Sequence, residues 1–519
     1  LKPLPAPARG ALRAGRAGGM LAGAAGGRMG AGAASPQTVG LSDRGAAPLM
    51  LSPGCEAREL AGRSAGGGKS NFVAAVGNFS IQYNFVSASI ALQILSSSRE
   101  LGHAIYPEPA WSASVTLAAV FLGAMVGMVS MGRLGDVLGR SRALCTTTIL
   151  AAVGAVVPAC AFGSSDLAYG ILCAGRLLLG IGVGGIFPLS AVHSAEGSEN
   201  LQNRVSRVTR AFFFQSVGMS VPYLVAMLLF VIIRPEQPAE WVPQLEFRLL
   251  FALGVIPGLV VIASTAREEE SADFRGLARE QTQAGGGVFA ALWAEPAETR
   301  WTLLGTAGTW FFYDICFYGS ATFTPDILNS ICFSGTKVAG KCDQTLFQTA
   351  WQSLAVQAMA MPGTLLALSL VSRLGSKRLN MLGLSLLCMD FTAMAVVSAT
   401  VEDAEAILFV LFCLLTFLLN FGPNVGTYVL PAICFPTHVR STCHGLSSFG
   451  GKTGAAVGAL MFPAVKATGW GMPGVMALQA VFAAVGVLMS HALLRHDWEY
   501  LGLEEKCPTA PFLDSSVGS

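Results

Sequence analysis

The sequence predicts an all-α membrane protein with about twelve transmembrane helices in two six-helix bundles. Of its 519 residues, 53% are hydrophobic and only 12% are charged, whereas soluble proteins carry about 25% charged residues. Apolar segments of about 20 residues, the length that crosses a bilayer, recur along the whole chain. No segment outside them is long and polar enough to form a catalytic domain, which argues against an enzyme.

Six apolar segments lie in the first half of the chain, at 71–95, 110–131, 144–162, 167–193, 211–233 and 247–265. Six more lie in the second half, at 301–328, 349–371, 380–398, 405–432, 446–465 and 472–494. The polar stretch from Arg267 to Gln283 separates the two sets. We therefore predict an N-terminal bundle over 71–265, a central loop over 266–300, a C-terminal bundle over 301–494 and a tail over 495–519.

The first 70 residues differ from the rest in composition, because they are rich in Ala, Gly and Arg and poor in acids. Such a stretch cannot bury a hydrophobic core, which predicts a disordered segment over 1–70. An acid-poor, Arg-rich composition is also typical of organellar targeting segments, so that alternative stays open.

The positions of Lys and Arg in the short loops predict the orientation in the membrane. The loops after the second and fourth segments are basic, and so is the loop after the eighth. The loops at 163–167 and 401–405 contain no base. Both termini and the central loop are therefore expected on the cytoplasmic side.

A glycine-rich basic loop follows the second segment, and a related one, Ser372 to Arg378, follows the eighth. Internal repeats of this kind are common in transporters. The first loop is similar to the Gly-x-x-x-Asp-x-x-Gly-Arg-x-Arg signature of the major facilitator superfamily. We interpret it as a gating loop in which Asp136 pairs with a helix terminus or an arginine; the alternative is a basic loop that only sets the topology. Its residues are Gly132, Asp136, Gly139, Arg140 and Arg142.

The fourth segment contains Gly180, Gly182, Gly184 and Gly185. No strand precedes them, so a nucleotide-binding loop is a poor interpretation. Small residues inside an apolar helix are better explained by close packing of helices.

The twelve cysteines include no pair with metal-ligand spacing. Cys332 and Cys342 share one predicted outward loop, where they form a disulfide if that side is oxidising, or remain two thiols. We expect no metal and no cofactor.

Polar groups inside the apolar segments are costly in lipid and therefore indicate a functional site. Trp310, Asp314 and Tyr318 recur every four residues, so they share one helical face. Asn424 follows a Gly-Pro interruption, and Lys452 lies well inside a small-residue segment. With Gln215, these groups could surround one small anion.

Each of these groups also has a structural interpretation. Asp314 and Lys452 could simply neutralise each other, and the amides of Gln215 and Asn424 could join helices. Asp390 and Arg176 are further candidates whose surroundings in the sequence are less informative.

The second-half motifs resemble the phosphate:proton symporters of the major facilitator superfamily, over about 71–495. They are Trp310 to Tyr318, Asn420 to Asn424, Phe435 to Gly445 and Gly451-Lys452; Gly184 to Ser190 and Gln215 are similar in the first half. The resemblance implies that phosphate or the proton contacts Gln215, Trp310, Asp314, Tyr318, Asn424 and Lys452. It implies inorganic phosphate, protons and the lipid bilayer as partners, with no nucleic acid, and we expect a monomer in the plasma membrane or an organellar membrane.

Two positions depart from the family. Ile186-Phe187 stands where the family has Asp-Tyr, and Asn84 stands where it has an acid. Asp314 is then the expected proton site: its protonation would remove repulsion of an anion held by Lys452. A transporter of another small anion or organic solute, and a non-transporting phosphate sensor, remain the alternatives.

Overall fold

The computed structural model describes residues 53–97, 103–138, 140–195, 201–233, 239–266, 293, 295–338, 341–435 and 439–496, without the side chains of 53–70 and of a few helix ends. The chain divides into two units, Leu1–Glu56 and Ala57–Ser519. Apart from the first four residues of α1, the features below belong to the second. Most of the predicted N-terminal segment, central loop and tail lies outside the described residues. So do the gating-loop side chains of Gly132, Asp136, Gly139 and Arg140; Arg142 is described.

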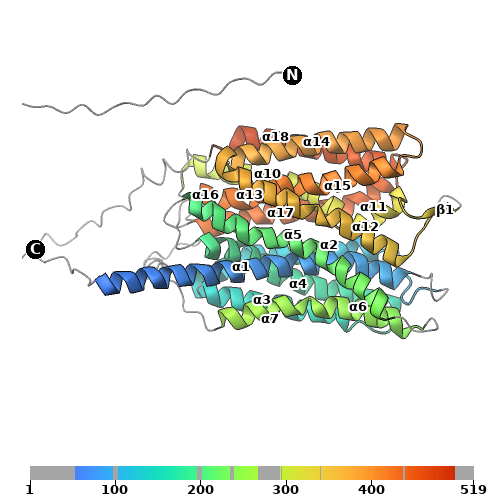
Figure 1. Cartoon of the computed structure of the whole chain (residues 1–519), viewed down its shortest axis with the longest axis horizontal. Coiled ribbons are helices and arrows are strands. Elements are labelled where there is room, and N and C mark those ends of the chain that lie inside the picture. Colours follow the sequence, from blue (N-terminus) through green and yellow to red (C-terminus); the bar gives the residue numbers. More distant parts are fainter. Residues whose placement is uncertain are drawn as a thin grey trace, which may run out of the picture. The chain divides into compact units, whose positions relative to one another are not determined.

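The first half of the chain forms seven described helices (Figure 1). They are α1 (Pro53–Ser96), α2 (Ser112–Leu138), α3 (Arg140–Ala159), α4 (Ser165–Ala195), α5 (Leu201–Ile232), α6 (Trp241–Leu253) and α7 (Val255–Thr265). Helix α1 begins at Pro53, well before the expected start at residue 71, in a stretch that contains the helix-forming residues Ala, Glu, Arg and Leu.

The second half continues with α10 (Ala297–Ala321), α11 (Thr324–Ile331), α12 (Leu346–Ala358), α13 (Ala360–Leu374), α14 (Ser376–Thr400), α15 (Glu405–Phe421), α16 (Pro423–Cys434), α17 (Arg440–Lys466) and α18 (Gly471–Leu493). A short antiparallel hairpin, β1 (Thr336–Val338) and β2 (Lys341–Asp343), joins α11 to α12 and pairs Lys337 with Cys342. We call the side of the bundles that carries it the hairpin end.

Four spans consist of two consecutive helices: α6 with α7, α10 with α11, α12 with α13, and α15 with α16. A proline ring collides with the carbonyl four residues before it. The first three breaks follow Leu253, Ala321 and Ala358, which lie four residues before Pro257, Pro325 and Pro362. The fourth falls at Gly422, directly before Pro423, as the sequence predicted. With the eight unbroken helices, the described residues form twelve spans, which confirms the predicted all-α architecture.

Contacts between the two halves follow a pseudo-twofold pattern. Helix α2 of the first half packs against α17, and α5 packs against α12 and α13. If the twelve spans are numbered in chain order, span 2 packs against span 11 and span 5 packs against span 8. Replacing each span by its counterpart six positions away converts one pair into the other. Helix α4 also touches α16 and α17.

The glycines of α4 allow close helix packing, as predicted. A Cβ on Gly180 would lie 2.1 Å from the Val120 carbonyl oxygen of α2, and one on Gly184 would lie 2.3 Å from that of Ala124. Only glycine lets the two backbones come so close, so α4 and α2 form a rigid pair in the N-terminal half.

Nine described spans are long and apolar enough to cross a membrane by length and composition alone. The described helices α1, α10 and α17 are not among the nine. Each of these three carries several buried polar side chains, including Asn78, Gln82 and Asn84 on α1, Thr309 and Asp314 on α10, and His444 and Lys452 on α17. Two of these three helices, α10 and α17, also carry the buried charges Asp314 and Lys452.

Candidate functional site

Helix α10 carries the aromatic and acidic stripe expected from the sequence. Trp310, Asp314 and Tyr318 lie one turn apart, and none of the three is more than 3% exposed. The Asp314 carboxylate also interacts with the Trp310 side chain. The predicted shared face of these residues is thus present in the folded helix.

Lys452 of α17 lies against this stripe. Its ammonium donates hydrogen bonds to Asp314 Oδ2 at 3.0 Å and to the Tyr318 hydroxyl at 2.9 Å. The residue is 1% exposed, so this is a buried ion pair. Gly451 leaves room for the indole, because a Cβ there would lie 2.5 Å from Trp310 Cδ1. Gly454 likewise brings α17 against the α10 backbone at Phe311.

Aromatic rings from both halves surround the ammonium. Lys452 Nζ lies 4.1 Å from the centre of the Tyr318 ring, 5.1 Å from that of Phe187 and 5.9 Å from that of Phe85. Ring faces attract cations, and most strongly where water is excluded. Phe187, which replaces the family's tyrosine, therefore still contacts the charge, but it offers no hydroxyl.

The N-terminal half reaches the pair directly through Gln82 of α1. Its amide donates to the Tyr318 hydroxyl at 3.4 Å, and its Oε1 is buried without a hydrogen-bond partner among the described residues. Gln82 was not among the residues predicted from the sequence. The signal lay in the spacing of Asn78, Gln82, Phe85 and Ser89, which places them on one face of α1.

Gln215 and Asn424 form a second polar cluster, also between the halves. Gln215 of α5 donates to Asn424 Oδ1 at 3.5 Å, and Asn424 donates to Asn420 Oδ1 at 2.7 Å across the Gly422 break. The ring centre of Phe187 lies 6.3 Å from that of Trp310 and 5.7 Å from that of Tyr428, which follows Asn424 by one helical turn. The six predicted residues thus fall into one directly bonded group and one neighbouring pair.

His444 of α17 is fully buried beside Trp310. Its ring lies 5.9 Å from the indole and 5.6 Å from the Tyr428 ring. Its Nε2 lies 3.2 Å from the Tyr428 carbonyl oxygen and its Nδ1 lies 3.3 Å from the Ser448 hydroxyl. With both nitrogens engaged, His444 supports the site rather than opening onto it.

Two other candidates do not join the described clusters. Arg176 is buried, and it donates to the backbone carbonyls of Thr116, Asn84 and Phe85, so it ties α4 to α1 and α2. Both carboxylate oxygens of Asp390 in α14 are buried without a hydrogen-bond partner in the described part of the chain.

The charged pair is enclosed. At the hairpin end, Ser89 of α1 donates to the Thr322 carbonyl of the other half at 2.8 Å. Next to it, Phe323 stacks on Phe462 within the C-terminal half, with centroids 4.7 Å apart. Toward the other end, the hydroxyls of Ser190 and Tyr428 lie 3.2 Å apart between α4 and α16. Both ends of the path between the halves are therefore closed in this structure.

A cavity of about 170 Å³ lies between α1, α11 and α17 at the hairpin end. Its charged lining consists of Glu108, Asp326 and Lys466. Burial, and then the neighbouring Asp326 carboxylate, raise the pKa of Glu108. This polar vestibule lies next to the Ser89 and Phe323 contacts that close the hairpin end.

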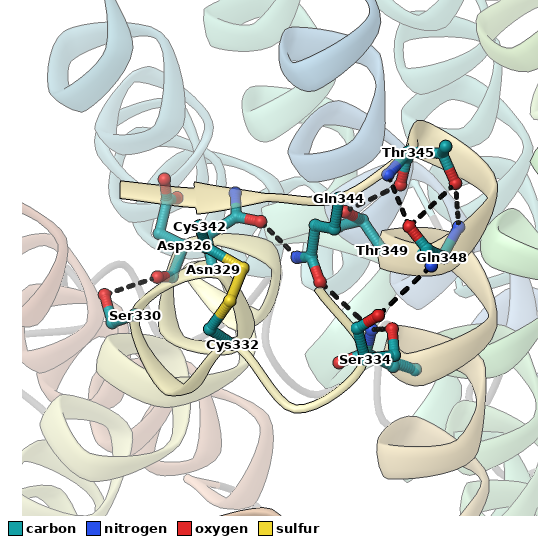
Figure 2. The surroundings of a disulfide bond; sticks show 11 residues. Asp326, Asn329, Ser330, Cys332, Ser334, Cys342, Gln344, Thr345, Gln348 and Thr349 are labelled. Atoms are coloured by element: carbon teal, nitrogen blue, oxygen red, sulfur yellow. Dashed lines mark hydrogen bonds between the residues drawn. A yellow bond between two sulfur atoms is a disulfide. The ribbon is translucent and has the colours of Figure 1, made fainter. Parts of the chain in front are cut away.

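Cys332 and Cys342 form a disulfide across the hairpin, which resolves the alternative left open by the sequence (Figure 2). Amides fasten the same loop to the helices: Gln344 donates to Asn329 of α11, and Gln348 of α12 donates to the Ser334 carbonyl. Asn329 in turn donates to Gln93 of α1 at 3.5 Å. The hairpin is thus linked to both halves.

Among the residues that the structure describes, no three His, Cys, Asp or Glu side chains are grouped to hold a metal ion.

The family model and two relatives that match this chain are all transporters by name. The family model "Sugar (and other) transporter" matches residues 70–493. The chain is 31% identical over 395 residues to "Inorganic phosphate transporter PT2" of Toxoplasma gondii, covering 75% of this chain and 66% of the relative. It is 28% identical over 472 residues to "Probable inorganic phosphate transporter 1-6" of Arabidopsis thaliana, covering 81% of this chain and 90% of the relative.

A solved structure shares the fold. The proton:xylose symporter XylE, bound to 6-bromo-6-deoxy-D-glucose, superimposes with a TM-score of 0.67 at 17% identity, covering 85% of this chain and 99% of its own. At this identity the likeness concerns the fold, which is that of the major facilitator superfamily.

Proposed function

The chain belongs to the sugar (and other) transporter family of the major facilitator superfamily, and from this premise we propose that it carries inorganic phosphate across a membrane by alternating access, coupled to protons. Two curated relatives that match most of its length are phosphate transporters by name. This multi-pass membrane protein is a transporter rather than an enzyme. A monomeric state and a plasma-membrane location stay predictions.

The buried ion pair of Lys452 and Asp314 is the observation that supports the proposal. An anion that leaves water needs a positive charge and hydrogen-bond donors to compensate for lost hydration. Lys452 supplies the charge, while the Trp310 indole and the Tyr318 hydroxyl supply donors beside it. The amides of Gln215 and Asn424 lie at the neighbouring interface.

The same pair supports proton coupling. While Asp314 is ionised, its carboxylate competes with an anion for the Lys452 ammonium. Protonation of Asp314 removes both the competition and the repulsion, so the proton and the anion stabilise each other in the site. The two halves then rock around the bound pair, and loss of the proton on the other side releases the anion. The Gly132–Arg142 segment, predicted as a gating loop, spans the end of α2 and the start of α3. There it would limit this motion.

Uptake into proteoliposomes tests the function. We expect the full-length protein to accumulate radiolabelled phosphate when an inward proton gradient is imposed. Asp314→Asn should lose gradient-driven uptake while phosphate exchange persists. Asp390→Asn is the matched control, because Asp390 is also a buried carboxyl but does not touch the cluster; it should behave as wild type.

The outcomes separate the candidates. An unchanged pH dependence in Asp314→Asn would exclude Asp314 as the proton site. Phosphate binding without uptake would indicate the sensor alternative. Accumulation of a different solute in a substrate panel would replace phosphate as the substrate.

A further inference from the structure

Gln82 is the residue of α1 that is hydrogen-bonded to the charged cluster of the other half. It is 1% exposed, and its Nε2 donates to the Tyr318 hydroxyl that also accepts from Lys452. Its carbonyl oxygen is buried and accepts no hydrogen bond from a described residue. A buried carbonyl without a donor is unfavourable, and such a group in a native protein calls for a specific explanation.

Gln215 has the same arrangement in the second cluster. Its Nε2 donates to Asn424 across the interface, and its Oε1 is also buried without a partner in the described part of the chain. Two glutamines of the N-terminal half thus donate to the C-terminal half, and each keeps an unused acceptor. Neither oxygen can be satisfied by the oxygens of a fully deprotonated anion, because those oxygens only accept.

We propose that Gln82, with Gln215, selects an oxyanion that carries its own hydroxyl protons, by accepting hydrogen bonds from them with its carbonyl oxygen. This deepens the proposed function, on which it rests, by naming the ionic form of the substrate. Dihydrogen phosphate has two P–OH donors and two acceptor oxygens. In the proposed complex, the acceptor oxygens of the phosphate face the Lys452 ammonium and the donors beside it. The phosphate hydroxyls face the side-chain carbonyls of Gln82 and Gln215. Sulfate has the same size and shape but no proton at neutral pH.

Gln82 therefore acts as a specificity-determining residue. With sulfate bound, the Gln82 carbonyl would stay unsatisfied and would face an anionic oxygen, and a site that hydrogen-bonds a substrate hydroxyl strongly rejects analogues that lack it. In this scheme Lys452 provides affinity for anions in general, and Gln82 provides the discrimination among them. Loss of the amide should then weaken phosphate binding more than sulfate binding.

Competition against radiolabelled phosphate on the purified full-length protein tests the proposal, with phosphate and sulfate as competitors. Gln82→Leu keeps the volume and removes the acceptor; we expect the preference for phosphate over sulfate to fall by about tenfold or more. Gln479→Leu is the control, because the buried Gln479 amide accepts from the Ser320 hydroxyl within the C-terminal half. It should keep the wild-type preference. Thermal unfolding of each variant establishes that it is folded.

A second measurement needs no variant. Monofluorophosphate replaces one P–OH by P–F at nearly constant size, and the fluorine makes the other P–OH acidic enough to lose its proton at neutral pH. It should therefore compete with phosphate about as poorly as sulfate does. Equal competition by phosphate and monofluorophosphate in the wild type would overturn the proposal, as would an unchanged preference in folded Gln82→Leu. Either result would leave proton-driven phosphate uptake standing, whereas failure of the wild type to bind phosphate would remove both.

Discussion

At the scale of single residues, Lys452 and Asp314 depend on each other. Each is buried, and the 3.0 Å ion pair neutralises both. Removing one partner of a buried pair costs about 3–5 kcal/mol, because the other charge is left uncompensated. We therefore expect Lys452→Met to lower the free energy of unfolding by about that amount.

The double variant Lys452→Met/Asp314→Asn should recover most of this loss, since neither buried charge remains. Thermal unfolding in detergent of the wild type, both single variants and the double variant gives the coupling between the two sites. Additive effects of the two substitutions would show that the residues do not interact in the folded protein.

The sequence identified part of this site for a physical reason. Asp314 and Lys452 are visible because a charge within an apolar segment is costly, and Trp310 and Tyr318 because they repeat at helical spacing. Gln82 also shares helical spacing with its polar neighbours, but an amide in a span usually joins helices, so this signal did not single it out. Its role depends on where α1 crosses α10, and the position of that crossing cannot be read from the sequence alone.

At the scale of elements, three of the four helix breaks could have been predicted from the sequence but were not. Pro257, Pro325 and Pro362 each lie four residues after the end of a helix, as expected from the collision of the proline ring. Hydropathy alone merges both pieces into one span, because the apolar character continues through the break. The break after Ala321 is the most consequential, since it separates α11 from the helix that carries Asp314.

The packing of α4 against α2 gives a prediction with a control on the same helix. In Gly180→Ala the new methyl group would lie 2.1 Å from the Val120 carbonyl oxygen, so the backbones must separate. We expect a loss of about 1–3 kcal/mol in the free energy of unfolding. Gly170→Ala meets no atom within 4 Å, so it should be neutral or stabilising by up to about 1 kcal/mol.

Thermal unfolding of the two variants side by side checks this contrast. Equal stability of Gly180→Ala and Gly170→Ala would mean that α2 and α4 are not as close in the membrane as in the structure.

At the scale of the whole molecule, two independent features indicate the same orientation. The basic loops predict that the hairpin end faces away from the cytoplasm. The Cys332–Cys342 disulfide lies at that end, and disulfides persist where the environment is oxidising. The arrangement of the two halves follows from contacts far apart in the chain, such as α2 with α17, which no local pattern reveals.

Thiol labelling on intact cells tests the orientation. In a Cys160→Ser background, which removes an exposed free thiol, Cys332→Ser leaves Cys342 without its partner. We expect a membrane-impermeant maleimide to label this variant without permeabilisation, and to label the parent only after reduction. The Cys332→Ser/Cys342→Ser double variant is the blank. Labelling that requires permeabilised cells would place the hairpin on the cytoplasmic side.

The hairpin also determines whether α11 and α12 can move independently of each other. Helix α11 is separated from α10 by the break after Ala321, while its other end is covalently joined to the strand that leads into α12. Helix α12 in turn lies on α5 of the opposite half. Any swing of α11 away from α1 must therefore carry α12 with it and shear the α5 interface, so the stiffness of that interface sets how readily the hairpin end opens.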